Sequence, residues 1–267
     1  MEKILQALKT TMEQPKIFGA WHLISLAIVI VLVVLVCIFL RNTKQKTYAA
    51  ILMTIWALML SLELINQFVS LYSITEDETI IWNYMWRKFP FQLCSLAIYI
   101  LPFIALLKDG KVRDVLSTFY FTYLLFGGLL VVVVPVNSFD ITIFHNVYGM
   151  AYHGLQVISA VYIAIYNRKR ISFINFLYAF IMFVCSVIIA TIMNVIAHAV
   201  NPDLQFNMFF ISPYIRRPIP ILNDAWQNMH WAPVLIIYTL GVSLIAFIIF
   251  LFFYLIFSAK KKKEGKK

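Results

Sequence analysis

Charged residues are scarce in this chain and are almost absent from its longest segments. Asp, Glu, Lys and Arg make up 13% of the 267 residues, whereas 62% are hydrophobic and the mean hydropathy is +0.85. A soluble domain is roughly half apolar and about one quarter charged. The shortage of charge therefore excludes an ordinary soluble domain and predicts an integral membrane protein.

Signatures of metal and cofactor sites are also missing. The three cysteines, Cys37, Cys94 and Cys185, form no CxxC pair, so neither a disulfide framework nor a thiolate metal site is predicted. The chain contains no HExxH pattern and no glycine-rich phosphate loop. We therefore expect no metal and no cofactor. No internal repeat or low-complexity linker divides the sequence, so residues 1–267 are expected to form one domain.

Seven apolar windows are long enough to cross a bilayer, because a spanning helix needs about 20 mostly apolar residues. They cover residues 17–40, 48–72, 89–107, 115–136, 144–166, 173–199 and 232–257, and a basic tail follows at 258–267. The sequence therefore predicts an all-α polytopic membrane protein, built as a bundle of seven transmembrane helices.

The distribution of Lys and Arg predicts the direction of these helices. The connections 41–47, 108–114 and 167–172 carry three basic residues each and the tail carries six, whereas all other segments share seven. Since basic loops stay on the cytoplasmic side during insertion, we expect the N-terminus outside and the C-terminus in the cytoplasm of a multi-pass plasma-membrane protein. The net charge of +10 then indicates anionic lipid headgroups at the cytoplasmic face as partners, and no nucleic acid.

Polar residues inside the predicted helices gather toward the outer side. All five histidines lie there, and Glu63 is the one formally charged residue within the seven windows. Polar groups are costly in a bilayer and usually face the bundle interior or a water-filled cavity. Glu63, Asn66 and Gln67 share one helix face, since they are spaced i, i+3, i+4. The pattern predicts an outward-facing polar chamber.

Two other windows bring polar stripes to the same half of the membrane. Tyr152 and Gln156 lie on one stripe with His153 beside it, and Asn194 and His198 are four residues apart in the sixth window. Taken singly, such a residue more often hydrogen-bonds or packs against a neighbouring helix than binds a ligand. The convergence of three stripes is what favours a functional site.

Cys94, His153 and Glu63 are the candidate catalytic residues. The helical rise places Glu63 and His153 at a similar depth of ~14 Å, and Cys94 at ~8 Å. His153 can accept the thiol proton while Glu63 or Gln156 orients its imidazole, and lipid ester carbonyls lie just beneath the headgroups. The sequence thus predicts acyl transfer or acyl hydrolysis on membrane phospholipids through a thioester.

The expected substrate-binding residues combine amides that donate to an oxyanion with groups at the mouth of the chamber. They are Gln92, Asn66, Gln67, Tyr152, Gln156, Asn194, His198, Arg216 and Arg217. The last two lie in the proline-containing sixth loop and are positioned to meet a lipid phosphate. The alternative is a non-enzymatic transporter or receptor-like protein, in which the chamber is a vestibule and Glu63 holds a proton or cation.

Four stretches carry a family resemblance: FPFQLCSLAIYI (89–100), FGGLLVVVVPV (126–136), FHNVYGMAYHG (144–154) and FNMFFISPYIRRPIPIL (206–222). Their order resembles the YwaF-like family of seven-span membrane proteins, whose animal relatives include a transmembrane acyltransferase that remodels ether phospholipids. The resemblance implies that Cys94 is the acyltransferase nucleophile and His153 its partner. The family motif is closer to Pro-Leu-His-Leu-Cys, so Gln92 stands where that histidine is, and the acidic residue after Pro135 is absent.

Overall fold

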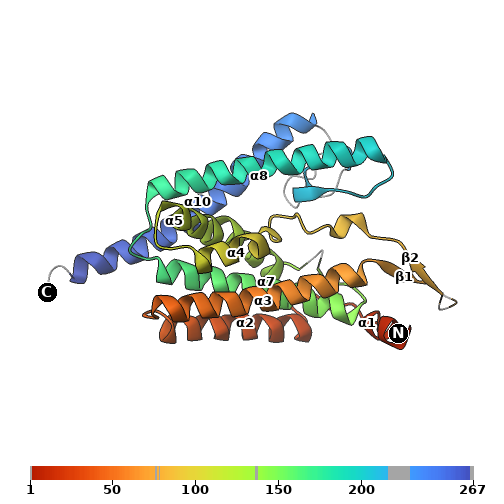
Figure 1. Ribbon diagram of the computed structural model, residues 1–267, viewed down its shortest axis with the longest axis horizontal. Helices are drawn as coiled ribbons and strands as arrows, with labels where there is room; N and C mark the ends of the chain where they lie inside the picture. Colours follow the sequence, from red (N-terminus) through yellow and green to blue (C-terminus); the bar gives the residue numbers. More distant parts are fainter. Residues whose placement is uncertain (1, 76, 78, 136–137, 216–228, 265–267) are drawn as a thin grey trace.

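Long helices that run side by side make up most of the structure (Figure 1). The structure is a computed structural model that describes residues 2–75, 77, 79–135, 138–215 and 229–264. Its elements are α1 (Glu2–Leu8), α2 (Ala20–Phe39), α3 (Gln45–Val69), β1 (Tyr72–Ile74), β2 (Ile80–Trp82), the 3₁₀-helix η1 (Trp86–Lys88), α4 (Leu96–Leu106), α5 (Lys111–Phe119), the π-helix η2 (Tyr120–Leu124), α6 (Leu125–Val133), α7 (Ile143–Tyr166), α8 (Phe173–Val200), the 3₁₀-helix η3 (Met208–Phe210) and α10 (Trp231–Glu264).

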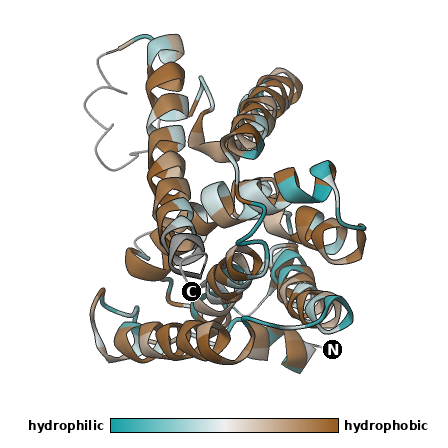
Figure 2. Ribbon diagram, turned by 90° about the vertical axis from the view of Figure 1, so that its left-hand side faces the viewer, coloured by the Kyte–Doolittle hydropathy of each residue, from teal (hydrophilic) through white to brown (hydrophobic). Residues whose placement is uncertain are grey.

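Five helices of the described chain are long and apolar enough to cross a membrane. They are α2, α3, the continuous unit Lys111–Val133, α8 and Trp231–Ser258 of α10. Only 17% of the apolar window in α2 is buried inside the protein, so most of its Leu, Ile and Val side chains face outward. Hydrophobic residues, coloured brown, make up most of the helices in Figure 2. A soluble monomer rarely exposes so large an apolar patch, and the prediction of a helical membrane protein is confirmed.

The third apolar window is shorter in the structure than predicted. The prediction was a helix over 89–107, but α4 covers Leu96–Leu106, and residues 89–95 form turns. Pro90 disfavours helix in the residue before it, and the side chain of Gln92 is used by a distant loop instead of by a helix face. The second window also ends early, because α3 stops at Val69 and the chain continues into the antiparallel hairpin β1–β2.

Pro102 lies inside α4 without ending it. A proline has no N–H, so the carbonyl of Ile98, four residues earlier, loses its helical partner. Trp56 Nε1 on α3 donates to this oxygen at 2.8 Å. The missing helical bond is thereby replaced by a bond that fastens α3 to α4.

Helix α7 is the central helix of the bundle and contacts α2, α3 and α6. Its 24 residues are long enough to cross a membrane, but its polar side chains keep it out of the apolar set. Glycines permit the close contacts: a Cβ on Gly154 would lie 2.8 Å from Val29 Cγ2 of α2, and one on Gly128 of α6 would lie 3.1 Å from Val157 Cγ2.

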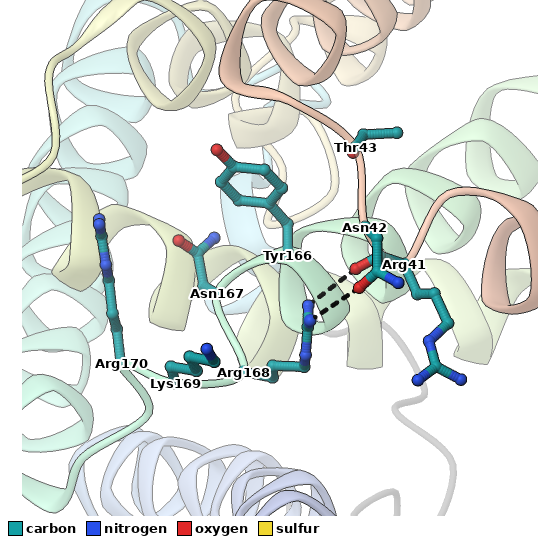
Figure 3. A pocket seen from close by; sticks show the side chains of 8 residues that line it. All are labelled: Arg41, Asn42, Thr43, Tyr166, Asn167, Arg168, Lys169 and Arg170. Carbon is teal, nitrogen blue, oxygen red and sulfur yellow. Dashed lines mark hydrogen bonds between the residues drawn. The ribbon is translucent and has the colours of Figure 1, made fainter.

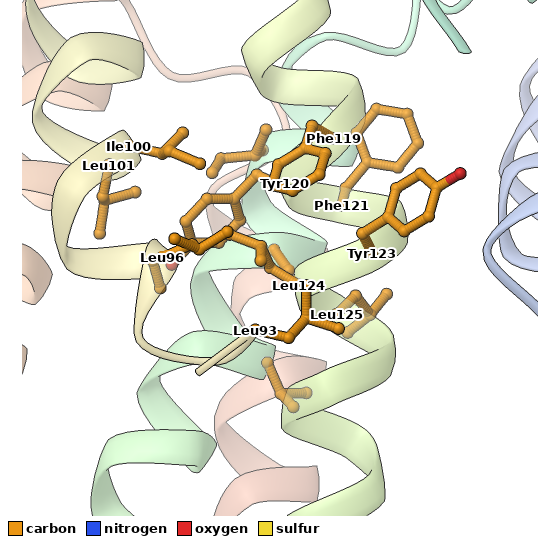
Figure 4. Packing of buried hydrophobic residues seen from close by; sticks show 14 of the residues in the cluster. Leu93, Leu96, Ile100, Leu101, Phe119, Tyr120, Phe121, Tyr123, Leu124 and Leu125 are labelled. Atoms are coloured by element: carbon orange, nitrogen blue, oxygen red, sulfur yellow. The ribbon is translucent and has the colours of Figure 1, made fainter. Parts of the chain in front are cut away.

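Figure 4 shows the apolar packing between the start of α4 and the α5–α6 unit, where Leu93 and Leu96 approach Leu124 and Leu125.

The two ends of the bundle differ in character. At one end, α1 and the hairpin lie beside residues 10–12, which pair with residues 141–143 through Met12 N to Ile141 O and Ile143 N to Thr10 O (Figure 1). At the other end, the basic connections 41–47, 108–114 and 167–172 come together through the bonds of Arg168 to Arg41 O and of Arg170 to Asp109. The predicted grouping of these three connections on one side agrees with this arrangement.

Replacing Gly154 by alanine is expected to loosen the α2–α7 contact. The added methyl would overlap Val29, and overpacking of this kind costs about 1–3 kcal/mol. We expect Gly154→Ala to lower the midpoint of thermal unfolding in detergent. Gly241→Ala is the matched control because no atom lies within 4 Å of its Cβ position, and equal midpoints for the two variants would contradict this packing.

Candidate functional site

Cys94 lies in the turn that leads into α4, on the inner side of the bundle. Its carbonyl accepts the N–H of Ala97 at 3.2 Å, which closes that turn. A Cβ on Gly127 of α6 would lie 3.0 Å from Cys94 Sγ, so the glycine makes room for the sulfur. The thiol is half-buried, whereas Cys37 and Cys185 are exposed. Cys94 is therefore the cysteine that the fold places inside the protein.

Glu63 is buried and accepts two hydrogen bonds. Its side chain is 3% exposed, and Gln67 Nε2 and Tyr148 Oη donate to its two carboxylate oxygens. Gln67 in turn accepts from Tyr84 Oη and donates to the carbonyl of Lys88. The predicted pair Glu63 and Gln67 is thus one polar network, which joins α3 to α7 and to the segment before α4.

Two tyrosines extend this network toward Cys94. The rings of Tyr148 and Tyr152, one turn apart on α7, have centroids 5.4 Å apart. Tyr152 Oη donates to the carbonyl of Cys94 at 3.4 Å. The chain of contacts therefore runs from the buried carboxylate to the backbone of the cysteine. Tyr148 was not among the predicted site residues, although it lies beside the stripe that contains Tyr152 and Gln156.

His153 has a defined tautomer in this structure. Its Nδ1 lies 2.7 Å from the carbonyl oxygen of Gly149. A carbonyl can only accept, so Nδ1 carries the proton and the neutral ring has an unprotonated Nε2. The half-buried imidazole is thus oriented by its own helix backbone, and not by Glu63 or Gln156 as expected, because Gln156 Nε2 donates to the carbonyl of Leu124 in the π-helix.

His22 provides a contrast with the opposite tautomer. The backbone N–H of Phe18 donates to Nδ1 of His22, so its Nε2 carries a proton and donates to the carbonyl of Val132 at 2.9 Å. This ring is fully buried with both nitrogens occupied. His22 therefore links α2 to α6, while His153 keeps a basic nitrogen.

Glu63 and His153 do not lie at the same level. Glu63 is six residues before the end of α3, and His153 is ten residues after the start of α7. The hydrogen bond of Glu63 goes to Tyr148, five residues or ~7 Å earlier on α7 than His153. The two groups differ in depth because α3 ends at Val69, three residues before the end inferred from hydropathy, while α7 begins at Ile143, one residue before its inferred start.

Cys94 and the turn of α7 that follows His153 pack against the same turn of α6. Cys94 packs on Gly127, and Val157, one turn after His153, packs on Gly128. Within the described part of the chain, no hydrogen bond joins the thiol to the imidazole. Gly127 and Gly128 thus lie between the turn that carries the candidate nucleophile and α7, which carries the candidate base.

Two predicted amides hold a loop. Gln92 Nε2 donates to Asn207 O at 2.9 Å, and its Oε1 accepts from Phe209 N at 2.7 Å. Asn194 makes the same pair of bonds with the carbonyl and N–H of Met208. Phe209, which makes the last of these bonds, and Phe210 after it have φ of 56° and 59°, which costs strain in a residue other than glycine. The amides therefore stabilise a strained loop next to Cys94's turn, a contact with no local sequence signal.

The remaining predicted residues are divided. His198 stacks on Tyr214, with centroids 3.7 Å apart. Asn66 is buried and its Oδ1 has no partner among the described residues. Arg216 and Arg217 lie outside the described residues. In the described chain no group of His, Cys, Asp or Glu is arranged to hold a metal.

Removing the Gln92 amide is expected to release the loop. Gln92→Met keeps the size of the side chain but leaves Phe209 N–H and Asn207 C=O without partners, at about 1–3 kcal/mol for each buried group. We expect at least about tenfold faster hydrogen exchange across residues 206–211, measured by mass spectrometry. Gln205→Met, an exposed amide of the same loop, should leave exchange unchanged. Unchanged exchange in Gln92→Met would show that the Gln92 amide does not hold this loop.

The comparisons with known proteins give one match. No curated protein and no solved structure matches the chain. The model described as the TMEM164 family matches residues 17–264, which include every described helix except α1. The matched region contains the Glu63 network, Cys94 and His153. The chain belongs to the TMEM164 family of membrane proteins.

Proposed function

We propose that this protein transfers or hydrolyses acyl groups of membrane phospholipids through Cys94 and His153. The observation that carries the proposal is the tautomer of His153, whose bond to Gly149 O leaves Nε2 free to accept a proton. A thiol needs such a base, because the thiolate is the nucleophile. The packing of Cys94 on Gly127, and of Val157, one turn after His153, on Gly128 supports the pairing of the two groups.

The proposed reaction has two balanced halves. Cys94 Sγ forms a bond with the ester carbonyl carbon as its proton passes to His153 Nε2, and the C–O bond breaks as the leaving alcohol takes that proton. A second alcohol or water then gives its proton to His153 and attacks the thioester. The C–S bond breaks and the sulfur recovers the proton. A lipid acceptor gives transfer, and water gives hydrolysis.

The Glu63 network is proposed to position the nucleophile. Glu63 accepts a hydrogen bond from Tyr148, whose ring packs against that of Tyr152, and Tyr152 donates to the carbonyl of Cys94. The resemblance of the stretches around Cys94 and His153 to YwaF-like proteins, and through them to an ether-phospholipid acyltransferase, supports the same assignment. Gln92, where that family has histidine, is proposed to act through the loop that it holds, and Arg216 and Arg217 are proposed to meet the lipid phosphate.

The membrane arrangement proposed for this activity has seven crossings. In addition to the five apolar helices, residues 89–107 with α4 and the polar helix α7 would each cross the plasma membrane. The basic end is proposed to face the cytoplasm and the hairpin end the exterior, in keeping with the basic connections. Cys94 then opens toward the outer leaflet.

Labelling with an electrophilic lipid tests the catalytic assignment. A phospholipid analogue that carries a fluoromethyl ketone should modify the wild-type protein in lipid nanodiscs. We expect Cys94→Ala to abolish labelling and His153→Gln to slow it by about 10²–10⁴-fold, the usual contribution of a general base. Cys37→Ala and Cys185→Ala are matched controls that remove exposed thiols and should label at the wild-type rate. Equal labelling rates for the wild type and all four variants would contradict the proposal.

A second candidate is favoured by one feature. Transporters often place their binding sites at discontinuous helices, and α4 has 11 residues preceded by the non-helical segment 89–95. In this candidate the chamber is the vestibule of a transporter or receptor, and Glu63 is the proton or cation site. The labelling experiment separates the two, because a vestibule cysteine reacts at a rate that does not depend on His153.

Cysteine accessibility tests the crossing by residues 89–107. In a background with Cys37, Cys94 and Cys185 changed to alanine, Asp77→Cys at the hairpin tip should react with a membrane-impermeant maleimide in intact cells. Lys108→Cys should react only after permeabilisation. Both positions are exposed, so burial does not mask them. Reaction of both from the same side would show that this segment does not cross, and a reversed pattern would overturn the orientation.

A further inference from the structure

A basic cavity lies at the end of the bundle opposite the β1–β2 hairpin, between the α2–α3 loop and the α7–α8 loop (Figures 1 and 3). Its volume is 310 Å³, at the lower end of the range of about 300–1,000 Å³ for small-molecule pockets. Arg41, Arg168, Lys169 and Arg170 all line it. Four cations around one small cavity point to an anionic ligand.

Arg168 builds the wall of this cavity. Its Nη1 donates to Arg41 O at 2.8 Å and its Nη2 donates to Asn42 Oδ1 at 3.1 Å, so one guanidinium joins the two loops (Figure 3). Both acceptors are neutral. The positive charge of Arg168 is therefore held in place and is not compensated by a carboxylate.

The other cations differ in whether they are compensated. Arg170 pairs with Asp109, and the hydrogen bond from Arg170 lowers the pKa of that carboxyl, which keeps it charged. Arg41 and Lys169, in contrast, have no hydrogen bond or carboxylate partner for their side chains within the described chain. Basic residues at the C-terminal ends of α2 and α7 also interact favourably with the helix dipoles. That role does not explain why several of them line one cavity.

Asn167 adds a second requirement for the ligand. Its side chain is buried, with 4% exposed, and its Nδ2 donates to Ile163 O at 2.9 Å. This bond fixes the orientation of the amide, and the remaining Oδ1 is buried without a partner among the described residues. A buried carbonyl oxygen needs a donor, which an ionised phosphate does not supply but a neighbouring hydroxyl does.

We infer that this cavity binds a phosphate ester of a small polyhydroxy alcohol, of the glycerol phosphate type, with the phosphate on Arg41, Arg168 and Lys169 and a hydroxyl donating to Asn167. Guanidinium and ammonium groups bind phosphate oxygens through charge-assisted hydrogen bonds. The ester has two sources: the headgroup of a phosphatidylglycerol-type lipid in the adjacent leaflet, or a soluble glycerol phosphate. The inference is independent of the activity proposed for Cys94.

Binding to charge-matched variants tests the inference. The full chain is placed in phosphatidylcholine nanodiscs with and without phosphatidylglycerol at about one lipid in ten. The lipid retained by the protein is counted by native mass spectrometry. Arg41→Gln/Lys169→Gln removes two cations that line the cavity and leaves the loop bonds of Arg168 intact. Lys46→Gln/Lys108→Gln removes two exposed cations from nearby connections and is the control. Soluble glycerol 3-phosphate and inorganic phosphate are added as competitors.

Wild type, the control variant and Cys94→Ala are expected to retain phosphatidylglycerol equally, with at least about tenfold weaker retention in the Arg41→Gln/Lys169→Gln variant. Displacement by glycerol 3-phosphate at low millimolar concentration or below identifies the soluble ester as the ligand, and no displacement identifies the lipid. Equal losses in the two double variants would mean general attraction to a basic surface and would overturn the site. Displacement by inorganic phosphate as strong as by glycerol 3-phosphate would overturn the role of Asn167.

Discussion

The structure depends on one constraint: a polar group inside an apolar bundle must find its hydrogen-bond partner in the protein, because little water is present to replace it. The bonds that result connect helices far apart in the sequence. Trp56 satisfies the carbonyl freed by Pro102, and Gln156 donates to the carbonyl of Leu124 in the π-helix. At these two irregular turns, a polar side chain from a neighbouring helix is the hydrogen-bond partner.

The same constraint shapes the candidate site. Glu63 is deeply buried, so it must be paired, and its partners Gln67 and Tyr148 belong to two helices. The contact between Tyr148 and Tyr152 connects this pair of hydrogen bonds to the backbone of Cys94. His153 Nδ1 likewise donates to the carbonyl of Gly149, and the remaining nitrogen, Nε2, is the proton acceptor in the proposed reaction. The hydrogen bond between His153 and the carbonyl of Gly149 thus both satisfies a polar group in the bundle and leaves Nε2 as a base.

Hydropathy predicted the helices well, since long apolar segments have few alternatives in a membrane. Helices α2, α7 and α8 begin and end within about three residues of the predicted windows. It failed for residues 89–95, because the apolar residues there pack in a turn whose polar side chain, Gln92, serves the loop at 207–209. That contact spans 115 residues and leaves no periodic trace in either segment.

The residues of the site could be gathered from the sequence, but their partners could not. The spacing of polar residues on helix faces identified Glu63, Gln67, Tyr152 and Gln156. Backbone acceptors such as Gly149 O and Leu124 O carry no residue-type signal.

The most direct measurement for the central claim is the mass of the Cys94 peptide after incubation of the wild-type protein with a phospholipid of defined acyl chain. The account predicts an added acyl mass on Cys94 that neutral hydroxylamine removes. An acyl mass confined to Cys37 or Cys185, or absent from all three cysteines at a time when lipid turnover is measurable, would contradict it.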